Sequence, residues 1–140
     1  MRELFMTESC TFCKIARKEA PASYVYEDEK AMAFLSTRPV NLGHTLVGPK
    51  IHYENVFEIS EDEVAHLSKI VKRVAYAVKE AVGAEGIRIV QNNGEAAGQV
   101  IFHLHFHIIP MYAELSSLHG REIREASALE GDAKRIRRFL

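Results

Sequence analysis

Three histidines at alternate positions are the residues of this sequence best suited to chemistry. His103, His105 and His107 lie in the run V-I-F-H-L-H-F-H-I-I-P over residues 100–110. Side chains of a β-strand alternate between its two faces, so a strand here would put the imidazoles on one face, about 7 Å apart. The apolar residues between them would then face the core. Because neutral imidazole serves as nucleophile, proton carrier or metal ligand, the run predicts a catalytic or metal-binding site.

The second candidate is the pair Cys10 and Cys13, which are the two cysteines of the chain and have the spacing C-x-x-C. A secreted disulfide scaffold of this size normally has more cysteines at other spacings. Metal ligands, a redox pair and two buried thiols remain open. A thioredoxin-like redox pair is the weakest of these, because the expected helix-opening context with a nearby proline is missing.

The elements that would position these residues are several short strands and one long helix. Ser60 and Glu63 form a capping box, after which apolar residues repeat at helical spacing up to Val82, and Gly83 is a natural stop. Strands are predicted over residues 23–26, 31–35, 44–47, 86–90 and 99–111, and shorter helices over 14–19 and 121–138.

Composition and charge limit the classes of function. The 140 residues, 47% hydrophobic and 26% charged, suffice for one domain with a buried core. Eighteen Lys and Arg against 19 Asp and Glu give a net charge of −1, which disfavours a protein that coats nucleic acid or an anionic membrane. No apolar run approaches the roughly 18 to 20 residues of a membrane span, and the first residues lack a signal-peptide core. We therefore expect a cytoplasmic protein without membrane or nucleic-acid partners.

Several motifs in a fixed order resemble the histidine triad (HIT) superfamily, in particular its Hint and Fhit branches. The family pattern His-φ-His-φ-His-φ-φ, with φ apolar, is matched by residues 103–109. Matching motifs elsewhere are C-T-F-C-K-I from residue 10, V-Y-E-D from 25, G-H-T-L-V-G-P-K from 43, N-N-G from 92 and A-G-Q from 97.

The resemblance implies an α+β fold for a single HIT domain over residues 1–140, with residues 113–140 as a C-terminal extension. In this fold a mainly antiparallel sheet of about five strands packs beside one long helix, with a short helix near the N-terminus. Relatives of this kind are homodimers, so a homodimer is expected here.

The resemblance further implies a nucleotide hydrolase or transferase that acts on the α-phosphate of a nucleotide conjugate. His105 would attack phosphorus and form a nucleotidyl-histidine intermediate, which water hydrolyses to a nucleoside monophosphate. His107 would contact the phosphate or handle the proton of the leaving group, and His44 would support the nucleophile from a neighbouring strand. The implied substrates are nucleoside 5′-phosphoramidates or dinucleoside polyphosphates with a purine base, and no organic cofactor is implied.

Eight residues match nucleotide-binding positions of the family. They are Phe12, Ile15 and Phe34 for the base, and Ser36, Asn92, Gly98, Gln99 and Val100 for the ribose and the α-phosphate. Two of them depart from the family pattern. Ser36 replaces the usual Asp, whose carboxylate grips the ribose hydroxyls, and Val100 lacks the hydroxyl that Hint and Fhit proteins often have there.

The resemblance also implies a structural zinc site, which in many bacterial and archaeal HIT proteins joins the C-x-x-C pair to two histidines. The matching residues are Cys10, Cys13, His52 and His103. Two thiolates and two imidazoles fill all four positions of a tetrahedral zinc ion, an arrangement typical of structural sites.

Two other functions stay open at this point. Ser36 and Val100 leave room for a nucleotide-binding or interaction protein with little turnover. A zinc-dependent hydrolase could instead use all three histidines of the triad as ligands of a catalytic ion. Three in-line ligands two residues apart converge poorly on one ion, however, because zinc ligands must lie within about 2.1 Å of it.

Overall fold

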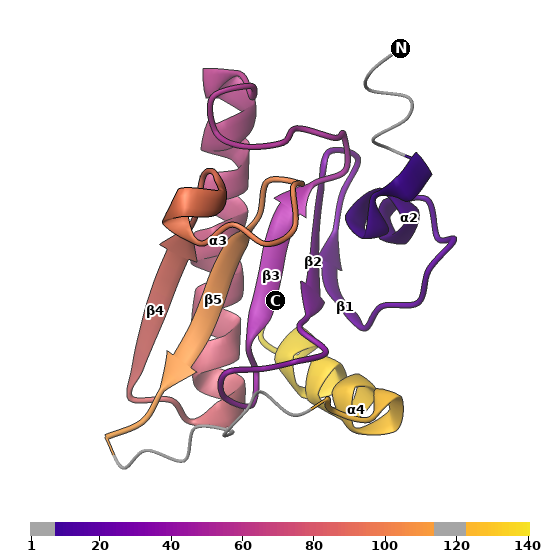
Figure 1. Cartoon of the computed structure of the whole chain (residues 1–140). Helices are drawn as coiled ribbons and strands as arrows, with labels where there is room; N and C mark the ends of the chain where they lie inside the picture. Colours follow the sequence, from indigo (N-terminus) through magenta and orange to yellow (C-terminus); the bar gives the residue numbers. More distant parts are fainter. Residues whose placement is uncertain (1–7, 114–122) are drawn as a thin grey trace.

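The chain forms a five-stranded antiparallel sheet with helices packed against it, as a computed structural model describes for residues 8–113 and 123–140 (Figure 1). The elements are α2 (Thr11–Ala16), β1 (Tyr24–Glu27), β2 (Ala31–Leu35), β3 (Thr45–Pro49), α3 (Glu61–Val82), β4 (Gly86–Gln91), a 3₁₀ turn (Glu95–Ala97), β5 (Phe106–Met111) and α4 (Ala126–Arg137). The strand order is β1-β2-β3-β5-β4, with every neighbouring pair antiparallel. The expected α+β fold is confirmed.

Helix α3 is built as its sequence predicts. The Ser60 hydroxyl accepts a hydrogen bond from the Glu63 N–H at 3.2 Å, and Gly83 ends the helix in the left-handed conformation with φ 68°. One face of α3 buries Leu67, Ile70, Val71, Val74, Ala77 and Val78. The helix runs behind β3, β5 and β4 in Figure 1, so this apolar face covers one side of the sheet.

Helix α4 packs on the same core. Its residues Leu129, Ala133 and Ile136 are buried, and in Figure 1 it crosses near one end of β1 and β2. Just before it, the Arg124 backbone N–H donates to the carbonyl oxygen of Thr37 at 2.9 Å. The predicted helix over residues 121–138 is thus observed over 126–137, and residues 121 and 122 lie outside the described part of the chain.

The strand predicted over residues 99–111 is wrong in its first half, because β5 begins only at Phe106. Ahead of it, the Leu104 N–H donates to the carbonyl oxygen of Tyr53 at 2.7 Å, so the chain has left the sheet. Val100 is 83% exposed and Phe102 39% exposed, and the continuous apolar face that alternation predicts is absent. The His103 ring is instead buried beside Cys10 and Cys13, and its Nε2–H donates a hydrogen bond to the Pro49 carbonyl oxygen. These contacts take the place of strand pairing.

Gly48 lets this segment pass close to β3. A Cβ atom at Gly48 would lie 2.8 Å from the carbonyl oxygen of Leu104 and 3.7 Å from the Cβ of His105. The first distance is shorter than real contacts allow, so a residue without a side chain is required where the two segments cross.

The remaining boundaries shift by a few residues. Helix α2 starts at Thr11 rather than at residue 14, because the Cys10 side chain accepts a hydrogen bond from the Cys13 N–H at 3.4 Å and caps the helix. The third strand runs to Pro49 rather than ending at residue 47. None of the described helices is long and apolar enough to cross a bilayer.

Candidate functional site

His105 lies directly ahead of β5, at the wall of an open cavity of about 610 Å³. Its Nδ1–H donates to the carbonyl oxygen of His103 at 2.6 Å. With the proton on Nδ1, the lone pair of the ring is on Nε2. Burial lowers the pKa of His105, so the ring is neutral near pH 7. The residue is therefore a neutral imidazole with a defined nucleophilic nitrogen.

His107 and His44 form a hydrogen-bonded pair beside it. The Val40 N–H donates to His44 Nδ1 at 3.0 Å, which places the proton of His44 on Nε2. His44 Nε2 lies 3.0 Å from His107 Nδ1, so Nδ1 of His107 accepts and its own proton is on Nε2. The rings of His105 and His107 are 4.9 Å apart between centroids. The Nε2 lone pair of His105 and the Nε2–H donor of His107 thus belong to neighbouring rings.

The far wall of the cavity is apolar. Phe12 contacts Phe34 edge to face with 5.2 Å between ring centroids, and contacts His105 in the same way at 5.1 Å. Ile15 lines the same wall and is buried. All three residues predicted for base binding therefore line the cavity, and their faces suit a flat aromatic ligand.

The residues predicted for ribose and phosphate divide between the cavity and its supporting loop. Ser36, Asn92, Gly98 and Val100 line the cavity. Gln99 is not among the lining residues. Its side-chain N–H groups donate to the carbonyl oxygens of Glu54 and Ile101 at 2.6 Å and 3.1 Å, and its Oε1 accepts from Gly94, so it braces the loop.

Several residues that line the cavity were not predicted from the sequence. Leu46, opposite Phe34 in the β2–β3 register, could have been found by pairing the two strands. Pro21, Ala22 and Ile101 have no sequence signal that points to the cavity. Arg38, two residues past Ser36, also lines it, as do Thr11, Leu35 and Thr37.

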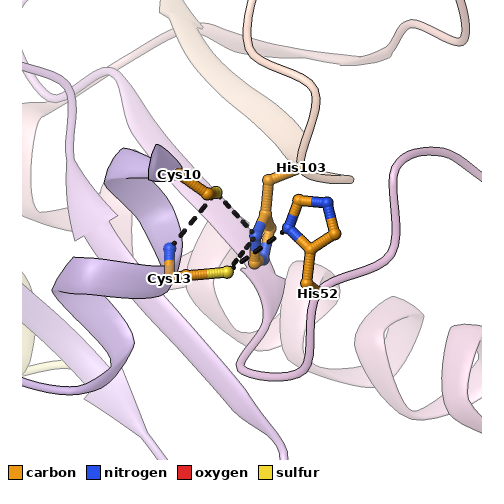
Figure 2. Close-up of side chains that lie close together, drawn as sticks. All are labelled: Cys10, Cys13, His52 and His103. Carbon is orange, nitrogen blue, oxygen red and sulfur yellow. Dashed lines mark hydrogen bonds between the residues drawn. The ribbon is translucent and has the colours of Figure 1, made fainter. Parts of the chain in front are cut away.

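Cys10, Cys13, His52 and His103 form a cluster whose ligand atoms all lie within 4.8 Å of one another. The side chains of Cys10, the N-cap residue of α2, and Cys13, within α2, point toward the two rings, which come from separate segments (Figure 2). The sulfur–Nδ1 distances are 3.4 Å and 3.5 Å from His103 to Cys10 and Cys13, and 3.3 Å from His52 to Cys13. In a tetrahedral zinc site, sulfur and nitrogen ligands lie about 3.5 Å apart, so the donor set fits a zinc ion.

The protonation state of His103 also suits a zinc ligand. His103 Nε2–H donates to the Pro49 carbonyl oxygen at 2.7 Å, so Nδ1 holds the lone pair that faces the sulfurs. Burial lowers the pKa of His103 to about 4, which keeps the ring neutral as a metal ligand must be. Burial, together with Cys10, raises the pKa of the Cys13 thiol to about 12. A bound cation would reverse this last shift, because a coordinating thiol is deprotonated.

The cavity and the cluster share the triad segment but not its residues. His103 belongs to the cluster, whereas His105 and His107 line the cavity. Among the described residues, the candidate metal ligands include neither of these two, so the three histidines do not converge on one ion.

Comparisons with known proteins fit this geometry. Residues 17–114 match the family described as HIT domain. The chain is 40% identical over 102 residues to the adenosine 5′-monophosphoramidase hnt1 of Schizosaccharomyces pombe, covering 73% of this chain and 74% of that protein. It is 42% identical over 105 residues to the adenylylsulfatase HINT3 of Arabidopsis thaliana, covering 75% of this chain and 53% of that protein.

A solved structure gives the same agreement in three dimensions. The crystal structure of a Zn-bound histidine triad family protein from Mycobacterium smegmatis superposes with a TM-score of 0.84 at 34% identity. The match covers 95% of this chain and 94% of that one.

Proposed function

The chain belongs to the HIT family, and we propose that it hydrolyses nucleotide conjugates at the α-phosphate through a nucleotidyl-histidine intermediate on His105. The relatives named adenosine 5′-monophosphoramidase and adenylylsulfatase support nucleotide hydrolase activity. The observation that carries the mechanism is the 2.6 Å hydrogen bond from His105 Nδ1–H to the His103 carbonyl oxygen, which leaves Nε2 as the nucleophile. The proposed substrates are nucleoside 5′-phosphoramidates or dinucleoside polyphosphates, with a purine as the base.

In the first step, Nε2 of His105 forms a bond to the α-phosphorus. The bond from phosphorus to the leaving group breaks, and the leaving group keeps its electron pair. The Nε2–H of His107 donates a hydrogen bond to the leaving nitrogen or oxygen, which takes any proton it needs from solvent. The hydrogen bond with His44 holds the His107 ring in the tautomer required. The product of this step is a nucleotide joined to His105 through phosphorus.

In the second step, water adds to phosphorus and the bond to His105 Nε2 breaks. A proton of that water passes to solvent, His105 is again a neutral imidazole with its proton on Nδ1, and a nucleoside monophosphate leaves. Imidazole leaves phosphorus readily, so Nε2 of His105 serves as the nucleophile of the first step and as the leaving atom of the second.

The cavity wall assigns parts of the substrate to the remaining residues. The base would lie against Phe12, Ile15 and Phe34, which are buried and apolar. Asn92 and Gly98 would meet the phosphate, because an amide side chain and a backbone without Cβ offer neutral donors to an anion. Val100 and Gln99 would contribute through the backbone alone.

We also propose a structural zinc ion held by Cys10, Cys13, His52 and His103. The ion would tie α2 and the loop after β3 to the segment that carries His105, and would supply rigidity rather than chemistry. No step above passes through it.

A homodimer is the remaining part of the proposal. Strand β4 is an edge of the described sheet, and its residue Ile89 is 51% exposed there. Multi-angle light scattering should give a mass twice the 15.8 kDa of the chain, and a mass of one chain would contradict a dimer.

The mechanism is tested by trapping the intermediate. Wild-type protein, His105→Ala and the control His66→Ala are mixed with adenosine 5′-phosphoramidate or a diadenosine polyphosphate, quenched in base and weighed intact. We expect an adenylyl adduct and release of AMP with wild type and the control, and neither with His105→Ala. Turnover that survives in His105→Ala would contradict the mechanism. Binding without any turnover would favour a nucleotide-binding protein.

A further inference from the structure

One stretch of the cavity wall has a charge that the rest lacks. Ser36, Thr37 and Arg38 follow β2 along the cavity, with Ser36 buried and Arg38 exposed. Among the described residues that line the cavity, Arg38 is the only Lys or Arg, and none is Asp or Glu. The described part of this wall thus combines a cation with no carboxylate, a charge that favours anions.

The position of this stretch relative to the proposed nucleotide follows from its hydrogen bonds. Ser36 lies two residues beyond Phe34, and its backbone N–H donates to the carbonyl oxygen of His44 at 2.9 Å. His44 in turn pairs with His107 at 3.0 Å. Ser36 thus lies between the apolar wall and the histidines. A nucleotide with its base at Phe34 and its α-phosphate at His105 would place its sugar beside Ser36.

The groups around that sugar are donors rather than acceptors. The Ser36 Oγ accepts from the Arg38 backbone N–H at 3.2 Å, and its O–H is a donor that a ligand in the cavity can use. Arg38, which lines the cavity two residues on, adds the several N–H donors of a guanidinium. A carboxylate at this place would accept from two ribose hydroxyls and repel a phosphate. Dinucleotide-binding folds show the same contrast, with an acidic residue on a free ribose hydroxyl and an Arg where that hydroxyl is phosphorylated.

The backbone of this stretch is held in place from outside the cavity. The Thr37 carbonyl oxygen accepts from the Arg124 backbone N–H at 2.9 Å. The Arg124 guanidinium makes two hydrogen bonds to the buried Asp132 at 2.8 Å and 3.2 Å. Arg38 therefore extends from a fixed turn, and less ordering is needed when it binds a ligand.

We propose that the cavity binds nucleotides that have a phosphate on the ribose, with the Ser36 hydroxyl and the Arg38 guanidinium as its ligands. The substrate class is then a nucleoside 2′- or 3′-phosphate conjugated at its 5′-phosphate. The proposal rests on the orientation of the nucleotide given under the proposed function.

Calorimetric titration tests this without requiring turnover. The probes are AMP, adenosine 3′,5′-bisphosphate, adenosine 2′,5′-bisphosphate and ADP. We expect wild type to bind one of the two bisphosphates about ten-fold more tightly than AMP, the size of effect of a charge-assisted hydrogen bond. Which bisphosphate binds better identifies the phosphorylated hydroxyl.

Two variants and one control locate the effect. Arg38→Glu should remove the preference for the bisphosphate, and Ser36→Asp should reverse it in favour of AMP, because its carboxylate accepts from free hydroxyls. The control Arg88→Ala removes an exposed cation on β4, a strand with no residue in the cavity wall, and should keep the wild-type preference.

Equal or weaker binding of both bisphosphates to wild type would overturn the proposal. A preference that survives in Arg38→Glu would also overturn it. Loss of ADP affinity in Arg38→Glu with the bisphosphate preference unchanged would assign Arg38 to the leaving group instead. Hydrolysis of adenosine 5′-phosphoramidate is measured separately, so failure of the proposed function is recognised by absent turnover while the titrations still decide this inference.

Discussion

The Cys/His cluster, a candidate metal site, and the cavity use histidine in opposite ways. His103 donates through Nε2 to the Pro49 carbonyl oxygen and turns Nδ1 toward two sulfurs. His105, two residues later, donates through Nδ1 to the His103 carbonyl oxygen and keeps its lone pair on Nε2. Both rings are neutral and buried. The backbone carbonyl that each ring meets thus decides which nitrogen has the lone pair, and this separates the proposed metal ligand from the proposed nucleophile.

The largest effect should come from removing the nucleophile alone. We expect His105→Ala to lower kcat by about 10³-fold or more, because no other group would form the covalent intermediate. His103→Ala should reduce thermal stability more than His105→Ala does, since it would remove a cluster ligand. Steady-state rates and thermal melts of both variants measure this contrast. A His105→Ala enzyme that keeps a tenth of wild-type activity would remove the distinction between the two rings.

Removing the metal should affect the other region. We expect a chelator to release one zinc ion per chain and to lower Tm by about 10 °C, because a metal bound only by the folded state stabilises that state. The hydrolysis rate well below the new Tm should change little. Elemental analysis measures the zinc released, calorimetry measures Tm, and the same hydrolysis assay well below the new Tm measures activity. Lost turnover in a chelated but folded protein would favour the zinc-dependent hydrolase.

An effect of intermediate size is expected from disrupting the hydrogen bond between His44 and His107. His44→Leu should lower kcat by about ten- to a hundred-fold with a smaller change in KM, because His107 would lose the partner that sets its tautomer. His44→Gln should recover part of the loss, since an amide can accept from the Val40 N–H and donate to His107. Equal losses in both variants would assign His44 a packing role.

The smallest effect concerns the stability of the fold at low pH. It involves Asp28, which belongs to neither the cavity lining nor the cluster. Burial opposes ionisation of Asp28, but hydrogen bonds from Tyr26, from backbone N–H groups and from His66 outweigh it and lower its pKa to about 2. The ordinary Asp pKa near 3.9 is higher, so the stabilisation is complete above it and is lost as the pH falls toward 2.

Asp28→Asn should accordingly lose at most about 2.5 kcal/mol at pH 7 and show less change in stability between pH 4 and pH 2. Denaturant unfolding across this range measures it. A variant with the same acid dependence as wild type would show that another carboxyl causes the loss.

The order of motifs predicted most of the residues that the structure brings together in the cavity and in the cluster, because each motif is recognised from neighbours in sequence. The capping box at Ser60 predicts α3 correctly, since a cap depends on neighbours in sequence. Alternation failed over residues 99–105, where two long-range contacts replace sheet pairing: the Leu104 N–H meets Tyr53, and the His103 ring meets the cysteines. Periodicity describes a strand and has no information on such partners.

Arg38 was missed for the same reason. Nothing in its neighbourhood along the chain marks it as part of a cavity whose other walls come from α2 and from the loop ahead of β5. Its segment also depends on Arg124, far away in sequence.

Gly48 has a consequence for how this protein tolerates mutation. It is not among the cavity-lining residues and is no member of the metal cluster, yet any side chain there would meet the backbone of Leu104 and displace His105. In a library with every residue tried at every position and selected for hydrolysis, position 48 should be among the most depleted. Such a map, made without structural knowledge, would mark a functional residue at a place where only the crossing of two chain segments is at stake.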